Sequence, residues 1–169
     1  MIEWIKLEKS VAAKHPKYGI KRLAAFFRFA IIAAPAMWVL TSGGNLASIL
    51  NARGSFMYAD YLTMAGPLIL FFWSLWNVHL LGNMDARFIR SFYAYIVVGP
   101  VILTVMSLLW MALSGLSFDG QNFAAGMIGT ILGWFLWYGV AGLYVLFSVR
   151  INVSLLHRVK ASDPILSER

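Results

Sequence analysis

Four long apolar runs constrain this chain more than any other feature. They cover about residues 23–41, 61–81, 92–114 and 123–151. At a helical rise of about 1.5 Å per residue, each run is long enough to cross the roughly 30 Å hydrocarbon core of a bilayer. Only 12% of the 169 residues are charged, against roughly 25% in a soluble domain. The sequence therefore predicts a single membrane domain over residues 1–169.

The four runs are predicted to be helices, because the strands of a membrane barrel alternate apolar and polar residues and these runs do not. Short connections between the second, third and fourth runs force antiparallel neighbours. The predicted fold class is an all-α membrane protein, a four-transmembrane-helix bundle. Pro35, Pro67 and Pro100 each fall inside a different run. We expect a bend at each, with neighbouring groups satisfying the carbonyl that each proline frees.

The segments outside the spans have their own patterns. Residues 1–16 place apolar side chains near one helical face and lysines over much of the rest, which predicts an interfacial amphipathic helix that Pro16 ends. This helix would serve as a membrane anchor or as a docking helix for a partner subunit. The longest connection, 41–60, is expected to carry a short surface helix over 45–51. Residues 152–169 are predicted to form a tail.

Basic residues fix the predicted orientation. Thirteen of the fourteen lie before the first span or at its start, between the second and third, or after the fourth, and only Arg53 lies in the opposite connections. By the positive-inside rule both termini are cytoplasmic. We expect the first span to be an uncleaved anchor. The net charge of +7 then predicts contact with anionic lipid headgroups. No nucleic-acid partner is expected, because no groove-reading or base-stacking element is present.

Polar residues at the span ends are the candidates for a special role. Asn77 and His79 lie about 24–27 Å along the helix from Tyr61. This distance predicts that they form the wet, cytoplasmic end of the second span. Arg28, one turn into the first span, is expected to extend toward the cytoplasmic phosphates, with Asp85 or a lipid headgroup as the alternative partner.

The sequence contains few residues that indicate catalysis or cofactor binding. Neither a catalytic Ser-His-Asp grouping nor paired carboxylates are readable, and cysteine is absent, so the chain is not expected to be an enzyme. No carboxylate lies inside a span, where proton-coupled transport usually needs one. His15, His79 and His157 all fall on the cytoplasmic side, but only His79 lies in a span. We therefore predict neither a metal nor a haem site, and no cofactor other than lipid.

Glycines in the fourth run indicate close helix packing. Gly126, Gly129 and Gly133 share one helical face, while Gly139 and Gly142 lie roughly opposite. Small residues at such spacing let helices approach closely in membranes. One glycine face is expected to pack within the bundle and the other against a partner chain or lipid. The sequence does not say which of the two faces has which role.

The end of the fourth run carries a resemblance. Tyr144, Ser148 and Arg150 give a Tyr-x-x-x-Ser-x-Arg pattern similar to that of an uncharacterised family of small four-span bacterial inner-membrane proteins, domain of unknown function family 2569. The resemblance implies a multi-pass protein of the bacterial inner membrane with both termini inside, and it implies no activity. Arg150 is then a basic residue at the cytoplasmic rim.

Three functions follow as expectations. The first is a non-catalytic membrane subunit that packs against and stabilises a larger membrane complex. The second is a small four-helix component of a transporter, similar to the small subunits of tripartite transporters or to a homo-oligomeric carrier. The third is a subunit like a b-type cytochrome. The missing chemistry and the two glycine faces favour the first.

Overall fold

The computed structural model describes residues 3–19, 22–54, 57–114 and 120–166. Four long helices account for most of it: α2 (Arg22–Arg53), α3 (Leu62–Gly82), α4 (Arg87–Leu113) and α5 (Gly120–Phe147). All four are long and apolar enough to cross a membrane. The prediction of an all-helical bundle with four candidate spans is therefore confirmed.

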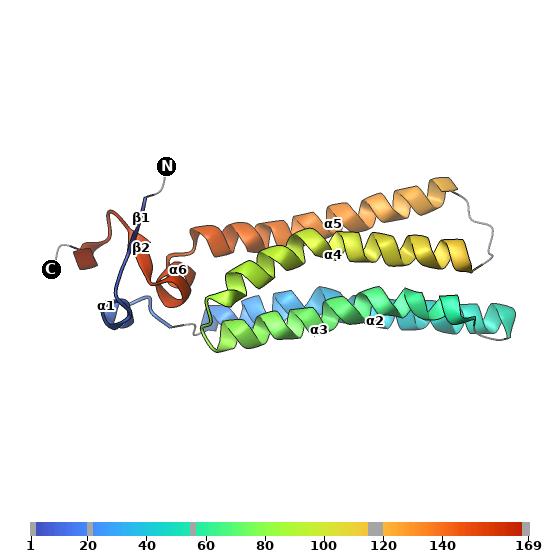
Figure 1. Cartoon of the computed structure of the whole chain (residues 1–169), viewed down its shortest axis with the longest axis horizontal. Coiled ribbons are helices and arrows are strands. Elements are labelled where there is room, and N and C mark those ends of the chain that lie inside the picture. The colour runs from blue at the N-terminus through green and yellow to red at the C-terminus, as the bar shows by residue number, and fades with distance from the viewer. Residues whose placement is uncertain (1–2, 20–21, 55–56, 115–119, 167–169) are drawn as a thin grey trace.

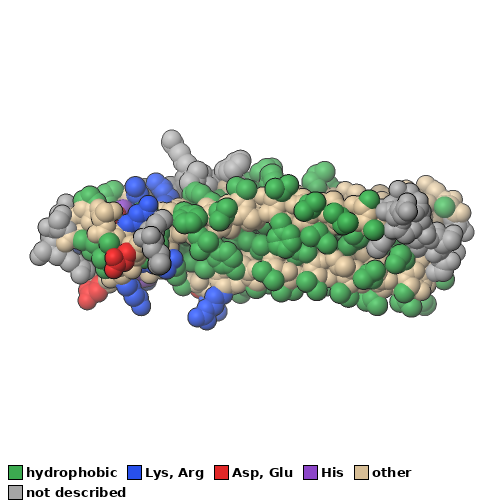
Figure 2. Space-filling model, turned by 90° about the horizontal axis from the view of Figure 1, so that it is seen from above, with side chains coloured by type: hydrophobic (Ala, Val, Ile, Leu, Met, Phe, Trp, Pro, Cys, Tyr) green, Lys and Arg blue, Asp and Glu red, His purple; other side chains and the backbone are tan. Residues whose placement is uncertain are grey.

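The long helices run side by side along the long axis of the molecule (Figure 1). α2 packs against α3, α3 against α4, and α4 against α5. Both chain termini lie at one end of the bundle (Figure 1). We call the half of the bundle nearer the termini the proximal half, and the other the distal half. Figure 2 shows Lys and Arg side chains gathered toward the terminal end, with hydrophobic side chains along the length of the bundle.

The first long helix continues well past its predicted end. The expected loop with a separate surface helix at 45–51 is wrong, because α2 is unbroken to Arg53. Thr41 and Ser48 donate their hydroxyls to Met37 O and Gly44 O, one turn earlier in the same helix. Their polar groups are thus satisfied without ending the helix. With 32 residues, α2 is about 48 Å long, which exceeds the hydrocarbon thickness.

The two terminal segments fold together. The predicted single helix over 1–16 is wrong, because residues Trp4–Lys6 form a strand, β1, and only Lys9–Lys14 form a helix, α1. β1 pairs antiparallel with β2 (Arg158–Lys160), so that Ile5 lies opposite Val159. The short helices η1 (Tyr58–Tyr61) and η2 (Pro164–Leu166) lie before α3 and near the C-terminus.

The predicted C-terminal tail is also folded. Helix α6 (Val149–Leu156) leads into β2, and the described tail residues lie over α1 and β1. We call residues 3–19 and 148–166 the terminal cap. Its small core consists of Leu7, Ala12, Val153 and Val159, all at least 96% buried. Leu7 falls off the apolar face of a 1–16 helix because it belongs to this core.

Candidate functional site

An aromatic cluster satisfies the backbone at two of the prolines. Pro100 has no N–H, so the carbonyl of Ile96 loses its helical partner. The indole Nε1 of Trp134 donates to that oxygen at 2.9 Å. Gly99 makes this approach possible, because a Cβ there would collide with the Trp134 ring. α4 bends near its middle, where Pro100 lies (Figure 1).

Helix α5, which carries Trp134, also supplies donors to the backbone near Pro35. The Tyr138 hydroxyl donates to Ile31 O at 3.2 Å, the oxygen that Pro35 frees, and Trp137 Nε1 donates to Ala30 O at 3.0 Å. The Tyr95 hydroxyl donates in turn to the Tyr138 oxygen at 3.3 Å. Side chains of α5 therefore bond to backbone carbonyls of both α2 and α4, at the positions where a proline removes the helical donor.

Asn77 and His79 separate in the structure. Asn77 is fully buried, and its amide nitrogen and oxygen both lack a hydrogen-bond partner among the described residues. His79 is exposed, stacks on Trp76 with ring centroids 5.6 Å apart, and lies 2.9 Å from the Asn83 amide. The prediction of a wet helix end is thus wrong for Asn77, because its helical face packs into the bundle with Ser74.

Arg28 does not pair with Asp85. The Asp85 carboxylate instead accepts two bonds from the Arg87 side chain, at 2.7 and 2.9 Å. The guanidinium of Arg28 lies beside Gly82, where an added Cβ would come within 3.4 Å of Nη2. Its Nε is buried and has no hydrogen-bond partner within the described part of the chain. The lipid headgroup that the sequence suggested for Arg28 remains a prediction.

The two glycine faces of α5 have different surroundings. A Cβ added at Gly142 would lie 3.1 Å from the Ile96 side chain, so this glycine packs tightly against α4. Gly126, Gly129 and Gly133 are exposed, and an added Cβ at any of them meets no atom within 4 Å. Gly139 likewise has open space at its Cβ position. Within the described residues, the first glycine face makes no helix contact.

That exposed glycine face continues into a groove. Trp137 and Val140 follow Gly126, Gly129 and Gly133 on the same side of α5, by their spacing of three and four residues. Both line an apolar groove of about 420 Å³ between α2 and α5, together with Ala30 of α2. α2 and α5 are joined there by large side chains rather than by close backbone contact.

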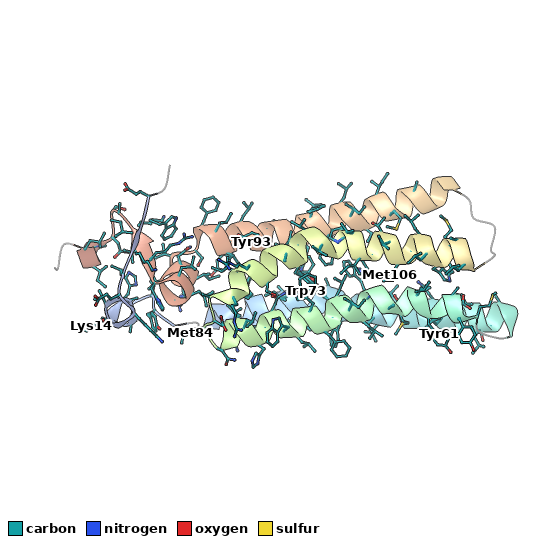
Figure 3. The ribbon with its side chains drawn as sticks, viewed as in Figure 1. Lys14, Tyr61, Trp73, Met84, Tyr93 and Met106 are labelled. Carbon is teal, nitrogen blue, oxygen red and sulfur yellow. The ribbon has the colours of Figure 1, made fainter. Side chains whose placement is uncertain are left out.

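A second cavity lies in the distal half and is lined by all four long helices. Its volume is about 270 Å³. Its walls combine hydroxyl, amide and indole groups with apolar and thioether side chains, namely Trp38, Thr41, Ser42, Asn45, Leu62, Thr63, Pro67, Leu103, Met106, Ser107, Trp110, Met127 and Thr130. Figure 3 labels Met106, which lies on the side of α4 that faces α3. Sequence reasoning missed this cavity, because each helix contributes only one to three polar residues.

The remaining candidate residues lie at the end of α5 and in the terminal cap. Ser148 accepts the N–H of Ile151 at 3.4 Å and caps α6, while Tyr144 packs against Phe27 with ring centroids 5.5 Å apart. Arg150 is partly exposed on α6. The Tyr-x-x-x-Ser-x-Arg pattern thus marks the point where the last long helix turns into the cap.

Asn152 has a structural role that the sequence did not indicate. Its amide nitrogen donates to Leu146 O at 3.0 Å and to Ser148 O at 2.8 Å, at the end of α5. Its oxygen accepts from Arg158 Nε at 2.7 Å, and the Arg158 guanidinium lies over the Trp4 ring. Asn152 therefore connects the end of the bundle to β2 directly and to β1 through Arg158.

The histidines of the cap have local partners. His15 accepts the N–H of Lys17 at Nδ1, which leaves Nε2 to donate to Asp163 at 3.2 Å. His157 ends α6 in the left-handed conformation, with φ of 50°. Among the residues that the structure describes, no three His, Asp or Glu side chains are grouped to hold a metal ion.

Comparisons with known proteins give no further information on this site, because no family model, no curated protein and no solved structure matches the chain. The class that the fold supports is a helical bundle with four candidate membrane spans.

Proposed function

We propose that this protein is a non-catalytic integral membrane subunit that packs against and stabilises a larger membrane protein complex. The observation that carries the proposal is the exposed glycine face of α5, at Gly126, Gly129 and Gly133. Glycine lowers helix stability in water and is retained in membrane helices where another backbone must come close. Since none of the helices that the structure describes covers that face, we assign it to a helix of another subunit.

The surroundings of the face support this assignment. It continues into the apolar groove between α2 and α5, so a partner helix would have a continuous, uncharged surface to follow along α5. Leu132 and Leu136 flank it and are 58% and 72% exposed. Without water to drive association, helix pairing in a bilayer depends on close packing, which small residues flanked by large ones provide.

We further propose that the protein lies in a bacterial inner membrane with both termini cytoplasmic. The excess of Lys and Arg at the terminal end supports that orientation. The resemblance in Tyr144, Ser148 and Arg150 is the reason for the bacterial assignment. A reporter fused after Arg169 should be active only when it functions in the cytoplasm. Activity of a periplasm-specific reporter at that position would contradict the proposed orientation.

Two glycine variants test the subunit role. Gly133→Leu places a large side chain on the exposed face, so we expect unchanged melting in detergent and loss of the partner that co-purifies with the wild-type protein. Gly142→Leu is the matched control on the other face. Overpacking against Ile96 should destabilise the chain itself, by about 1–3 kcal/mol.

Native mass spectrometry of the gently solubilised assembly gives the readout. A stoichiometric second subunit that is present in the wild type and absent in Gly133→Leu supports the proposal. A self-contained oligomer of this chain would favour the carrier alternative instead. A monomer in the wild type, or full partner recovery with Gly133→Leu, would reject the role of this face.

A further inference from the structure

We propose that the distal cavity binds a small uncharged molecule that combines an apolar body with a hydroxyl or carbonyl group. This inference is independent of the subunit role, because the cavity lies among the four long helices and the exposed glycine face lies outside it.

The first argument is the set of polar side chains without partners. Ser42 is 91% buried, lines the cavity and makes no hydrogen bond within the described chain. Ser107 is half-buried, lines the same cavity and also lacks a hydrogen bond among the described residues, whereas Asn45 lines it but is exposed. Polar groups removed from water are normally paired, so the hydroxyls of Ser42 and Ser107 beside one space indicate a polar occupant.

Two threonines that line the same cavity differ from these serines in their hydrogen bonds. Thr41 and Thr130 also line the cavity, but their hydroxyls donate to Met37 O and Gly126 O of their own helices. The hydroxyls of Ser42 and Ser107 do not. They therefore remain able both to donate to a ligand and to accept from it.

The second argument is the third proline. Pro67 frees the carbonyl of Thr63, and both residues line the cavity. At Pro35 and Pro100 a side chain of α5 donates to the freed oxygen. Among the described residues no side chain does so for Thr63 O. A ligand hydroxyl in the cavity would serve the purpose that Tyr138 serves at Pro35.

The third argument fixes the charge and the body of the ligand. Every side chain that lines the cavity is uncharged, and a charge buried there would have no counter-ion. Trp38, Leu103 and Met106 offer apolar and polarisable surface, and methionine adapts readily to different shapes. At about 270 Å³ the cavity is smaller than most drug-binding sites, which limits the ligand to roughly one ring.

Three matched probes test this chemistry. Benzyl alcohol, toluene and benzoate share one ring and differ in the polar group. Their dissociation constants would be measured by saturation-transfer NMR on the full chain in nanodiscs, with empty nanodiscs subtracted. We expect benzyl alcohol to bind about fivefold more tightly than toluene, the gain from one net hydrogen bond, and benzoate to show no protein-specific binding.

Serine variants locate the binding. In Ser42→Ala with Ser107→Ala, the preference for benzyl alcohol over toluene should fall clearly below fivefold, because the two hydroxyls are lost and only the backbone acceptor Thr63 O remains beside Asn45. Ser48→Ala is the matched control on α2, because Ser48 is exposed and its hydroxyl bonds to Gly44 O. It should leave the preference for the alcohol unchanged.

Each outcome either supports the proposed binding site or overturns it. A reduced preference in the double variant, with the full preference retained in Ser48→Ala, supports the site. The proposal is overturned if no probe gives protein-specific binding, if toluene binds as tightly as the alcohol to the wild-type protein, if benzoate binds as well as either, or if the double variant keeps the full preference.

Discussion

The proximal and distal halves of the bundle differ in how their polar side chains are bonded. In the proximal half, donors cross from one helix to another: Trp73 Nε1 donates to Ser91 Oγ at 3.0 Å, and the Tyr93 hydroxyl donates to Gly142 O at 2.8 Å. Figure 3 labels Trp73 and Tyr93 in this region. In the distal half, the hydroxyls of Ser48, Thr104 and Thr130 donate back to their own helices.

Burial differs in the same direction. Most of the large, fully buried side chains, including Trp134, Tyr95 and Phe92, belong to one core in the middle and proximal part of the bundle. The distal half instead contains the cavity and the exposed glycines. At the far end of the distal half, one hydrogen bond does join two elements: Trp110 Nε1 of α4 donates to the buried Asp60 carboxylate of η1 at 3.1 Å. The large buried core is therefore concentrated in the middle and proximal part, and the cavity and exposed glycines lie in the distal half, while the apolar groove between α2 and α5 lies beside the core.

The largest expected effect comes from Trp134. Trp134→Ala removes a buried indole and leaves Ile96 O without its donor, so we expect a loss of about 3–5 kcal/mol in unfolding free energy. Thermal and denaturant unfolding in detergent would measure it. Phe135→Ala is the control, since Phe135 is 46% exposed on the outer side of the bundle. Equal losses in both variants would mean that the proximal half is no better packed than the surface.

A double-mutant cycle tests the proline-carbonyl contact directly. Tyr138→Phe should cost about 1–3 kcal/mol, because it leaves a buried carbonyl and the Tyr95 hydroxyl without their partner. In a Pro35→Ala background the cost should fall, since the new N–H can bond to Ile31 O within the helix. Additive effects of the two changes would show that Tyr138 does not compensate for Pro35.

The third prediction has the opposite sign. Asn77→Leu replaces a buried amide without partners by an apolar side chain of similar size, so we expect unfolding free energy to rise by about 1–2 kcal/mol. Ser74→Ala, one turn away on the same buried face, is the control and should be neutral or slightly destabilising, because its hydroxyl is bonded to Phe71 O. A marked loss of stability with Asn77→Leu would mean that Asn77 has a hydrogen-bonded occupant in the membrane.

The sequence predicts that four long apolar helices form, because hydrophobic length is a local property, but it does not predict that the first continues to Arg53. It also predicts that the backbone carbonyl freed by each proline is bonded by a neighbouring group, but it does not predict which residue supplies the donor. Trp and Tyr are frequent in membrane helices for several reasons, and the contact of Tyr138 with Ile31 joins residues 107 positions apart. Only the packed helices show which aromatic side chain faces which freed oxygen.

The terminal cap was missed for a related reason. Its strands have three residues each, too few for an alternating pattern to be detected. Their partners lie at opposite ends of the chain, as with Trp4 and Lys160. Burial of Asn77 was missed because distance along a helix gives its depth in the membrane, whereas its rotation decides whether it faces water or the bundle.

The smallest expected effect lies in the proximal connection between α3 and α4. The hydrogen bonds from Arg87 hold the pKa of Asp85 below its usual range. A carboxyl with a lowered pKa stabilises the fold above its unfolded-state pKa, and this contribution is lost as the pH falls through the folded-state value. The difference in stability between the wild type and Asp85→Asn should therefore be present at neutral pH, begin to fall below about pH 4 and vanish once the folded-state carboxyl is protonated. Because the pair is exposed, the difference should be small and should shrink further in high salt.

Asp85→Asn keeps an acceptor for the Arg87 backbone N–H, so the comparison isolates the charge. Melting curves across pH and salt would measure it, with Arg87→Gln as the control that should show the same dependence. A difference that persists at low pH and high salt would mean that this connection is held by more than its local ion pair, and the proximal half would then owe part of its stability to charge rather than to its aromatic donors.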